Sequence, residues 1–220
     1  MRIGQTYLLS SNELSLIAAA SGMNTLLMFD CPSPNDRGAQ MQSVFRMLTD
    51  GLLIGKDNSI TPSPSLIPLL KAFKAASTAI VARLTSYEAA PICIYYGESE
   101  ETFLRIVPHA QKADTYEVSI TGLNDLLDDL EALHFLPVLR EWQTDDFKQQ
   151  EDSATIFDGA GDSTFSVFEK IDLSVQTLVS RVSITQSPSA WVLLSDLGPN
   201  AEHTSYSRNI FISWLKEGAL

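Results

Sequence analysis

The chain has 220 residues, of which 45% are hydrophobic and 19% are charged, so it can bury a sizeable core and is globular rather than disordered. Its formal net charge is −12. This acidity argues against nucleic acid or an anionic membrane surface as the main partner, because both require basic patches, and it is compatible with a basic protein partner.

The N-terminal segment and the two cysteines bear on the cellular compartment. The apolar stretch at residues 14–22 follows the polar run 10–13, which suits a helix cap better than a secretion signal. No apolar run approaches the ~20 residues of a membrane span. Cys31 and Cys93 lack metal-ligand spacing, and Cys93 lies in an apolar strand pattern typical of a core residue. We therefore expect a cytoplasmic protein without a metal or other cofactor.

The first 75 or so residues carry helix signals in a characteristic order. Ser10 stands three residues before Glu13, the spacing of a capping box, and Gly22 ends this first helix. A short hairpin around residues 56–58 separates the next two helices. Their expected apolar faces are Met41, Val44, Phe45 and Leu48 in the second helix and Leu66, Leu69, Leu70 and Phe73 in the third. The order of helix, helix, small hairpin and helix resembles a winged-helix unit.

Strand patterns follow at residues 80–84, 92–96 and 103–107, and the alternating segment Thr115 to Ile120 is expected to extend their sheet. The next segment, 121–136, has leucines at helical spacing on one side and acidic residues on the other, which predicts a strongly amphipathic helix.

The composition then shifts over residues 143–164, where six acidic residues stand against the single Lys148. This predicts a flexible acidic connection between residues 1–142, with the helices and first sheet unit, and residues 165–220, with a second sheet unit. Within the last part we expect a short helix at 165–173.

An internal similarity links the two sheet units. Shifting the sequence by 98 residues places 80–84 over 178–182 and 92–96 over 190–194. The third strands, 103–107 and 210–214, match only if the second hairpin loop is longer. The sequence therefore predicts an α+β fold in which two duplicated three-stranded antiparallel units form a quasi-twofold sheet platform, with flanking helices.

The residue types that carry catalytic chemistry do not converge in this sequence. The three histidines, His109, His134 and His203, have no partner at metal-ligand or catalytic spacing. Asp125, Asp128 and Asp129 share one helix face but alternate with leucines as any solvated face does. We expect no enzymatic activity.

The order of elements resembles the EspG-like chaperones of type VII (ESX) secretion systems. The similar parts are the capped helix "SSNELSLIAAASG", the segment "MLTDGLLIGKDNSITPSPSLIPLLKAF", the strands "STAIVARL", "APICIYYGESEETFLRIVP" and "DTYEVSI", and the helix "TGLNDLLDDLEAL". The resemblance implies a cytosolic, non-enzymatic chaperone or adaptor that binds a small helical secreted client, and a second sheet unit related to the first by a pseudo-twofold axis.

The candidate partner-binding residues lie in the hairpin "YGESEETF". They are the aromatic residues Tyr96 and Phe103 and the acidic residues Glu98, Glu100 and Glu101. Because Tyr95 and Tyr96 are adjacent in a strand, they point to opposite faces, and we expect one of them outside. An acidic tip between aromatic side chains would suit a client with an apolar end and nearby basic residues.

Two other classes of protein fit parts of the sequence. A winged-helix regulator would use residues 41–73, although few basic residues lie there and the chain is acidic. An immunity or scaffold protein that binds another protein would share the aromatic anchors, among which Trp191 and Trp214 are further candidates.

Overall fold

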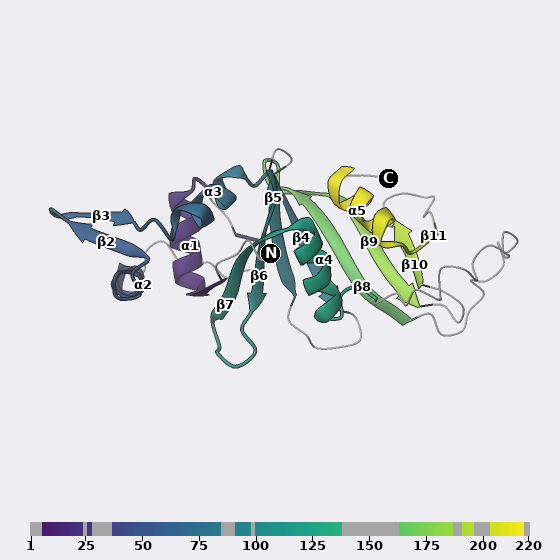
Figure 1. Ribbon diagram of the computed structural model, residues 1–220, viewed down its shortest axis with the longest axis horizontal. Helices are drawn as coiled ribbons and strands as arrows, with labels where there is room; N and C mark the ends of the chain where they lie inside the picture. Colours follow the sequence, from purple (N-terminus) through teal and green to yellow (C-terminus); the bar gives the residue numbers. More distant parts are fainter. Residues whose placement is uncertain are drawn as a thin grey trace, which may run out of the picture.

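The structure is a computed structural model that describes residues 6–23, 26–27, 37–84, 91–97, 100–137, 163–186, 191–195 and 203–217. In these residues, nine strands form one antiparallel sheet, and two more form a separate hairpin (Figure 1). The sheet strands are β1 (Thr6–Ser10), β4 (Thr78–Leu84), β5 (Ile92–Gly97), β6 (Glu100–Pro108), β7 (Thr115–Gly122), β8 (Ser163–Asp172), β9 (Thr177–Gln186), β10 (Trp191–Ser195) and β11 (His203–Ser205). The hairpin is β2 (Leu53–Lys56) with β3 (Ser59–Pro62), and the helices are α1 (Ser11–Ala20), α2 (Arg37–Thr49), α3 (Ile67–Ala75), α4 (Leu123–Ala132) and α5 (Arg208–Glu217).

The sheet has a symmetric order of elements about its centre. Its strands run β1-β7-β6-β5-β4-β8-β9-β10-β11, and the central strands β4 and β8 are antiparallel, with Val81 opposite Glu169. On each side of this pair the chain forms four successive strands and then a helix, β4 to β7 with α4 and β8 to β11 with α5. A twofold rotation about the β4–β8 pair therefore exchanges β4 to β7 with β8 to β11 in strand order, and β1 has no counterpart among the described strands.

The predicted alignment by 98 residues is wrong in its details. Residues 210–214, expected to be a third strand, belong to α5, which buries Phe211, Trp214 and Leu215 at helical spacing. The alignment also equates β4 with β9, whereas the topology places β4 opposite β8. Neighbouring strands of one sheet have a similar alternation of apolar residues. This pattern therefore did not show whether β4 corresponds to β8 or to β9.

The helix predicted at 165–173 is also wrong, because this segment lies in β8. Its side chains alternate with a period of two. Phe168 and Lys170 are buried towards α5, and Val167 and Glu169 point to the opposite face. Residues 143–162 of the predicted acidic connection lie outside the described part, and residues 163–164 begin β8.

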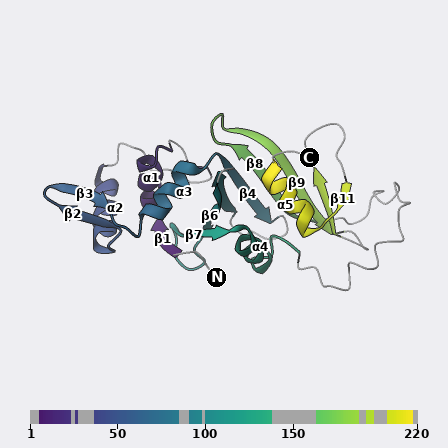
Figure 2. The same ribbon diagram turned by 45° about the horizontal axis from the view of Figure 1, so that its top comes forward.

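Two helical layers cover the sheet. Helices α4 and α5 pack on one face, where their buried side chains join those of β4, β5, β8 and β9 in a single apolar cluster. Helices α1 and α3 cover the other face of the half that contains β1 and β5 to β7, and form the second apolar cluster with it. Figure 2 shows α1 and α3 beside this half and α5 along β8 and β9.

The N-terminal helices follow the predicted order, with one error about which side of α2 is buried. The capping box is confirmed, since the Ser10 hydroxyl accepts from the Glu13 N–H and the Glu13 carboxylate accepts from the Ser10 N–H. Helix α3 buries Leu69 and Phe73 as predicted. The expected apolar face of α2 is not buried. The helix instead contacts α1 through the side that bears Ser43 and Met47.

Candidate partner-binding surface

The predicted hairpin site is not an exposed aromatic platform. The side chains of Tyr96 and Phe103 are only 6% and 4% exposed, and their rings pack together with centroids 5.4 Å apart. Tyr95 is buried too, because helical layers cover both faces of the sheet here. The expectation of an outward-facing tyrosine is therefore wrong. Glu98 and the side chains of Glu100 and Glu101 lie outside the described part, so their role stays a prediction.

Tyr96 instead helps to hold the last helix on the sheet. Its hydroxyl donates to the carbonyl oxygen of Leu215 at 2.5 Å, and the ammonium of Lys170 lies 5.3 Å from its ring centroid. Trp214 is buried in the same cluster and Trp191 is half-buried against it. Tyr96, Phe103 and Trp214 are therefore core residues, and Trp191 lies at the edge of the core.

The other residues singled out in the sequence have structural roles. Burial raises the pKa of the Cys93 thiol to about 12, as expected of a core cysteine. Asp128 and Asp129 are not simply solvated, since they form ion pairs with Arg208 of α5 (2.6 Å) and Arg105 of β6 (3.4 Å). In the described ranges, no cluster of three or more His, Cys, Asp or Glu side chains could hold a metal ion.

A charged cluster marks the sheet face away from α4 and α5, at the central strands. Glu169 of β8 accepts hydrogen bonds from Arg83 of β4 and from Arg181 of β9, the latter through Nη2 at 2.5 Å and Nε at 3.1 Å. Burial opposes ionisation of Glu169, but the two arginines outweigh it and lower the pKa of the carboxyl below its ordinary value. Two guanidinium groups surround one carboxylate, so the cluster has a net charge of +1 although the chain as a whole is acidic.

The same face is hollowed where the N-terminal helices end. A pocket of about 630 Å³ lies between the C-terminal ends of α1 and α3 and the turn that joins β8 to β9. Leu27 and Phe73 supply apolar surface and Lys74 supplies a cation at its wall. Asp172, three residues along β8 from Glu169, lies at its other side.

Exposed aliphatic side chains surround this turn. Val175 lies in the turn itself, Leu178 pairs with Ile171 of β8, and Val179 is the extra residue of a β-bulge; all three are 40% or more exposed. We call the combination of these aliphatic residues, the pocket and the arginine–glutamate cluster the junction surface. Its apolar side chains beside cationic groups can bind an apolar helix end that carries acidic groups.

Sequence patterns did not identify the junction surface, because its parts come from three segments that are far apart in the sequence, 21–27, 73–83 and 169–181. The only local signal was the presence of the aliphatic residues Val175, Leu178 and Val179 within five positions. Residues 178–182 were predicted to be a strand and lie in β9, and the bulge at Val179 and the absence of a covering helix in the described residues leave Leu178 and Val179 exposed.

No protein-family model and no curated protein matches the sequence. A solved structure does match in fold, that of the Mycobacterium tuberculosis type VII secretion system chaperone EspG5 in complex with a PE25–PPE41 dimer. The similarity covers 97% of this chain and 94% of that chain, with a TM-score of 0.54 and 10% sequence identity. The chain has an EspG-like fold. The match confirms, for the fold alone, the resemblance inferred from the order of elements. None of the helices in the described ranges is both long and apolar enough to cross a membrane.

Proposed function

We propose that this EspG-like chain is a cytosolic, non-enzymatic chaperone of type VII secretion that binds a helical secreted client. The observation that carries the proposal is the match to EspG5 along nearly the whole of both chains, because that chaperone was captured with a protein dimer bound. The symmetric β4–β8 platform further supports an internal duplication, with β4 equivalent to β8.

The junction surface is the contact area that we propose for the client. It offers exposed Val175, Leu178 and Val179 next to a pocket, which suits insertion of apolar side chains from a helix end. Arg83 and Arg181 would orient acidic groups on the client. A client helix with apolar side chains at its end and acidic groups nearby would therefore complement the junction surface both in apolar area and in charge.

The acidic tip of the β5–β6 hairpin is a second proposed contact. Glu98, Glu100 and Glu101 would attract basic residues of the same client and raise its association rate. Reversal of all three to lysine should slow association and weaken its salt dependence while the melting temperature holds. Unchanged association of a verified client would show that the tip is only a solvated turn.

The test begins with capture of partners by the tagged chain in its native host. A captured secreted helical protein would then be purified and its Kd for the chain measured by calorimetry. Leu178→Asp with Val179→Asp should raise the Kd at least tenfold without lowering the melting temperature, because both side chains are exposed. Leu133→Asp, which changes an exposed leucine at the end of α4, is the matched control.

Two outcomes would count against these proposals in different ways. Failure of the chain to bind any secreted helical protein in purified form would contradict the chaperone function itself. Tight binding that Leu178→Asp with Val179→Asp leaves unchanged would keep the function and exclude the junction surface.

A further inference from the structure

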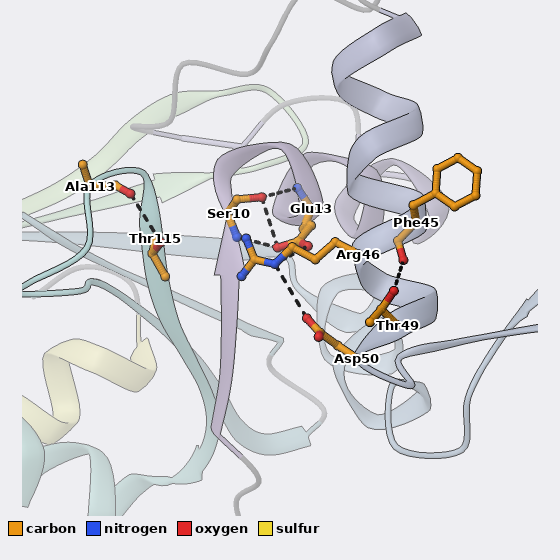
Figure 3. A network of polar contacts seen from close by, with 8 residues as sticks. All are labelled: Ser10, Glu13, Phe45, Arg46, Thr49, Asp50, Ala113 and Thr115. Carbon is orange, nitrogen blue, oxygen red and sulfur yellow. Dashed lines mark hydrogen bonds and ion pairs between the residues drawn. The ribbon is translucent and has the colours of Figure 1, made fainter.

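The ion pairs among the described residues differ in which charge is in excess. Arg46 lies between the carboxylates of Glu13 and Asp50, at 3.4 and 3.6 Å (Figure 3). Arg208 likewise lies between two carboxylates of α4. Glu169 has the reverse arrangement, because it is one carboxylate between two arginines. Among the described residues, positive charge is therefore in excess at this cluster, although the whole chain has a formal net charge of −12.

The backbone fixes the three charged groups of this cluster on one face of the sheet. Glu169 of β8 is directly opposite Arg181 of β9, and Arg83 of β4 is opposite Val167, two residues along β8 from Glu169. All three side chains therefore project from the face away from α4 and α5. The side chain of Glu169 is 16% exposed, whereas those of Arg83 and Arg181 are 44% and 40% exposed. The carboxylate is thus mostly buried between guanidinium groups that reach solvent.

The two guanidinium groups use both oxygens of the Glu169 carboxylate. Oε1 accepts hydrogen bonds from Nε and Nη2 of Arg181, at 3.1 and 2.5 Å, and Oε2 accepts one from Nη1 of Arg83. Planar guanidinium groups are the side chains best suited to bind a carboxylate, because several of their N–H groups point the same way. The cluster therefore has the composition of a carboxylate-binding site, and the carboxylate that occupies it belongs to the chain itself.

We propose that Arg83 and Arg181 form a carboxylate-binding site in which Glu169 is a built-in competitor for acidic groups of a partner. Because Glu169 is tethered beside the arginines, its effective concentration there is high, and a partner's carboxylate has to displace it or share its donors. The partner then binds less tightly, and leaves faster, than it would with the two arginines alone. Fast release suits a chaperone that passes its client on, and this part of the inference rests on the proposed function.

The competitor role and a purely structural role differ in what removal of Glu169 does. In both cases the fold loses charge-assisted hydrogen bonds and becomes less stable. If Glu169 is a competitor, its removal also leaves Arg83 and Arg181 able to bind a carboxylate from solution or from a partner. The variant is then less stable and at the same time binds carboxylates more tightly, whereas a purely structural carboxylate gives the first effect alone.

Rescue of Glu169→Ala by acetate tests the site on the full chain without any client. The melting temperature is measured at pH 7 in sodium acetate and in sodium chloride, each at about 200 mM. Acetate in the place of the lost carboxylate should raise the melting temperature of Glu169→Ala by about 2–4 °C relative to chloride. The wild type should show less than half of this difference, which measures the general effect of acetate on folded proteins.

Two further variants make the rescue specific. In Glu169→Ala with Arg181→Ala, the difference between the salts should fall to the wild-type value. Asp128→Ala is the matched control, because Arg208 keeps its second carboxylate on α4 and acetate has no place to fill. Glu169→Gln, which keeps the size of the side chain, replaces Glu169→Ala if that variant does not fold in either salt. Equal differences between the salts for the wild type and the Glu169 variant would overturn the proposal.

A purified client tests the competition itself. Glu169→Gln should lower the Kd of an acidic client at least threefold, mainly through slower dissociation, although the variant is less stable than the wild type. Asp114→Asn makes the same change of charge at an exposed turn outside the junction surface and should change the Kd less than twofold. A Kd that is unchanged or raised in Glu169→Gln would overturn the competitor role and leave the chaperone function intact. Rescue by acetate in a chain that binds no client would support the site and contradict the function.

Discussion

The Nζ atom of Lys170 in β8 lies 2.8 Å from the carbonyl oxygen of Leu215 in the last turn of α5. It is also 3.2 Å from the carbonyl oxygen of Trp214 and 5.8 Å from the ring centroid of Trp214. Carbonyl oxygens at a helix C-terminus have no N–H donors within the helix. A buried cation there donates hydrogen bonds to them and interacts favourably with the helix dipole. Lys170 thus links the centre of the sheet to the last helix.

Lys170→Met should lower the free energy of unfolding by about 1–3 kcal/mol, because it keeps the apolar stem but removes charge-assisted hydrogen bonds to two carbonyl groups. Urea unfolding followed by tryptophan fluorescence would measure this change. Lys71→Met on the exposed side of α3 is the control and should change it by less than about 0.5 kcal/mol. A Lys170→Met protein as stable as the wild type would mean that desolvation of the ammonium offsets its hydrogen bonds.

Glu169→Gln should change the pH dependence of stability. Hydrogen bonds from Arg181 and Arg83 exceed the effect of burial and hold the pKa of Glu169 below its ordinary value. A carboxyl of this kind stabilises the fold above its unfolded pKa of about 4.3, and the stabilisation is lost as pH falls through the folded pKa. The variant should therefore be less stable than the wild type at pH 7, and the difference should shrink below pH 4. Urea unfolding at a series of pH values would show it, and a difference that stays constant to pH 2 would contradict it.

Gly97→Ala should destabilise the chain where α3 meets β5. A Cβ atom at Gly97 would lie 2.1 Å from the backbone oxygen of Ala75, a contact that only a backbone shift can relieve. We expect a loss of about 2–3 kcal/mol in the free energy of unfolding, measured by urea or thermal unfolding. Gly122→Ala, with open space around the added carbon and an ordinary backbone conformation, should cost much less. Equal losses for the two variants would show that the close approach to Ala75 is not the cause.

Cys93 should resist alkylation in the folded protein. Its side chain is buried and burial raises the pKa of its thiol to about 12, so the reactive thiolate is scarce and shielded. In a Cys31→Ser background, iodoacetamide labelling at pH 8, read by mass spectrometry, should be at least a hundredfold slower in buffer than in 6 M guanidinium chloride. Rapid labelling without denaturant would show that β5 is exposed by local opening.

Local patterns predicted the elements whose burial follows from their own periodicity. The capping box of Ser10 and Glu13, the leucine face of α4 and the extra strand β7 are all present. Segments with apolar residues at both helical and alternating spacing were assigned wrongly. Residues 210–214 read as a strand and form a helix, and residues 165–173 read as a helix and form a strand. In both cases neighbouring elements decided the outcome, since β8 completes the centre of the sheet and α5 covers it.

The sequence by itself determined the class of fold, the order of most elements and the resemblance to the EspG-like chaperones. These depend on composition, caps and periodicity, which act over a few residues. For the aromatic residues of the β5–β6 hairpin and of α2, only the tertiary structure decided whether they are buried. Tyr96 and Phe103 are core because α4 and α5 cover their face of the sheet, whereas Phe45 is exposed because α2 contacts α1 with its other side. An apolar side chain has the same tendency to leave water in either case, and whether it can do so depends on whether a distant segment packs against it.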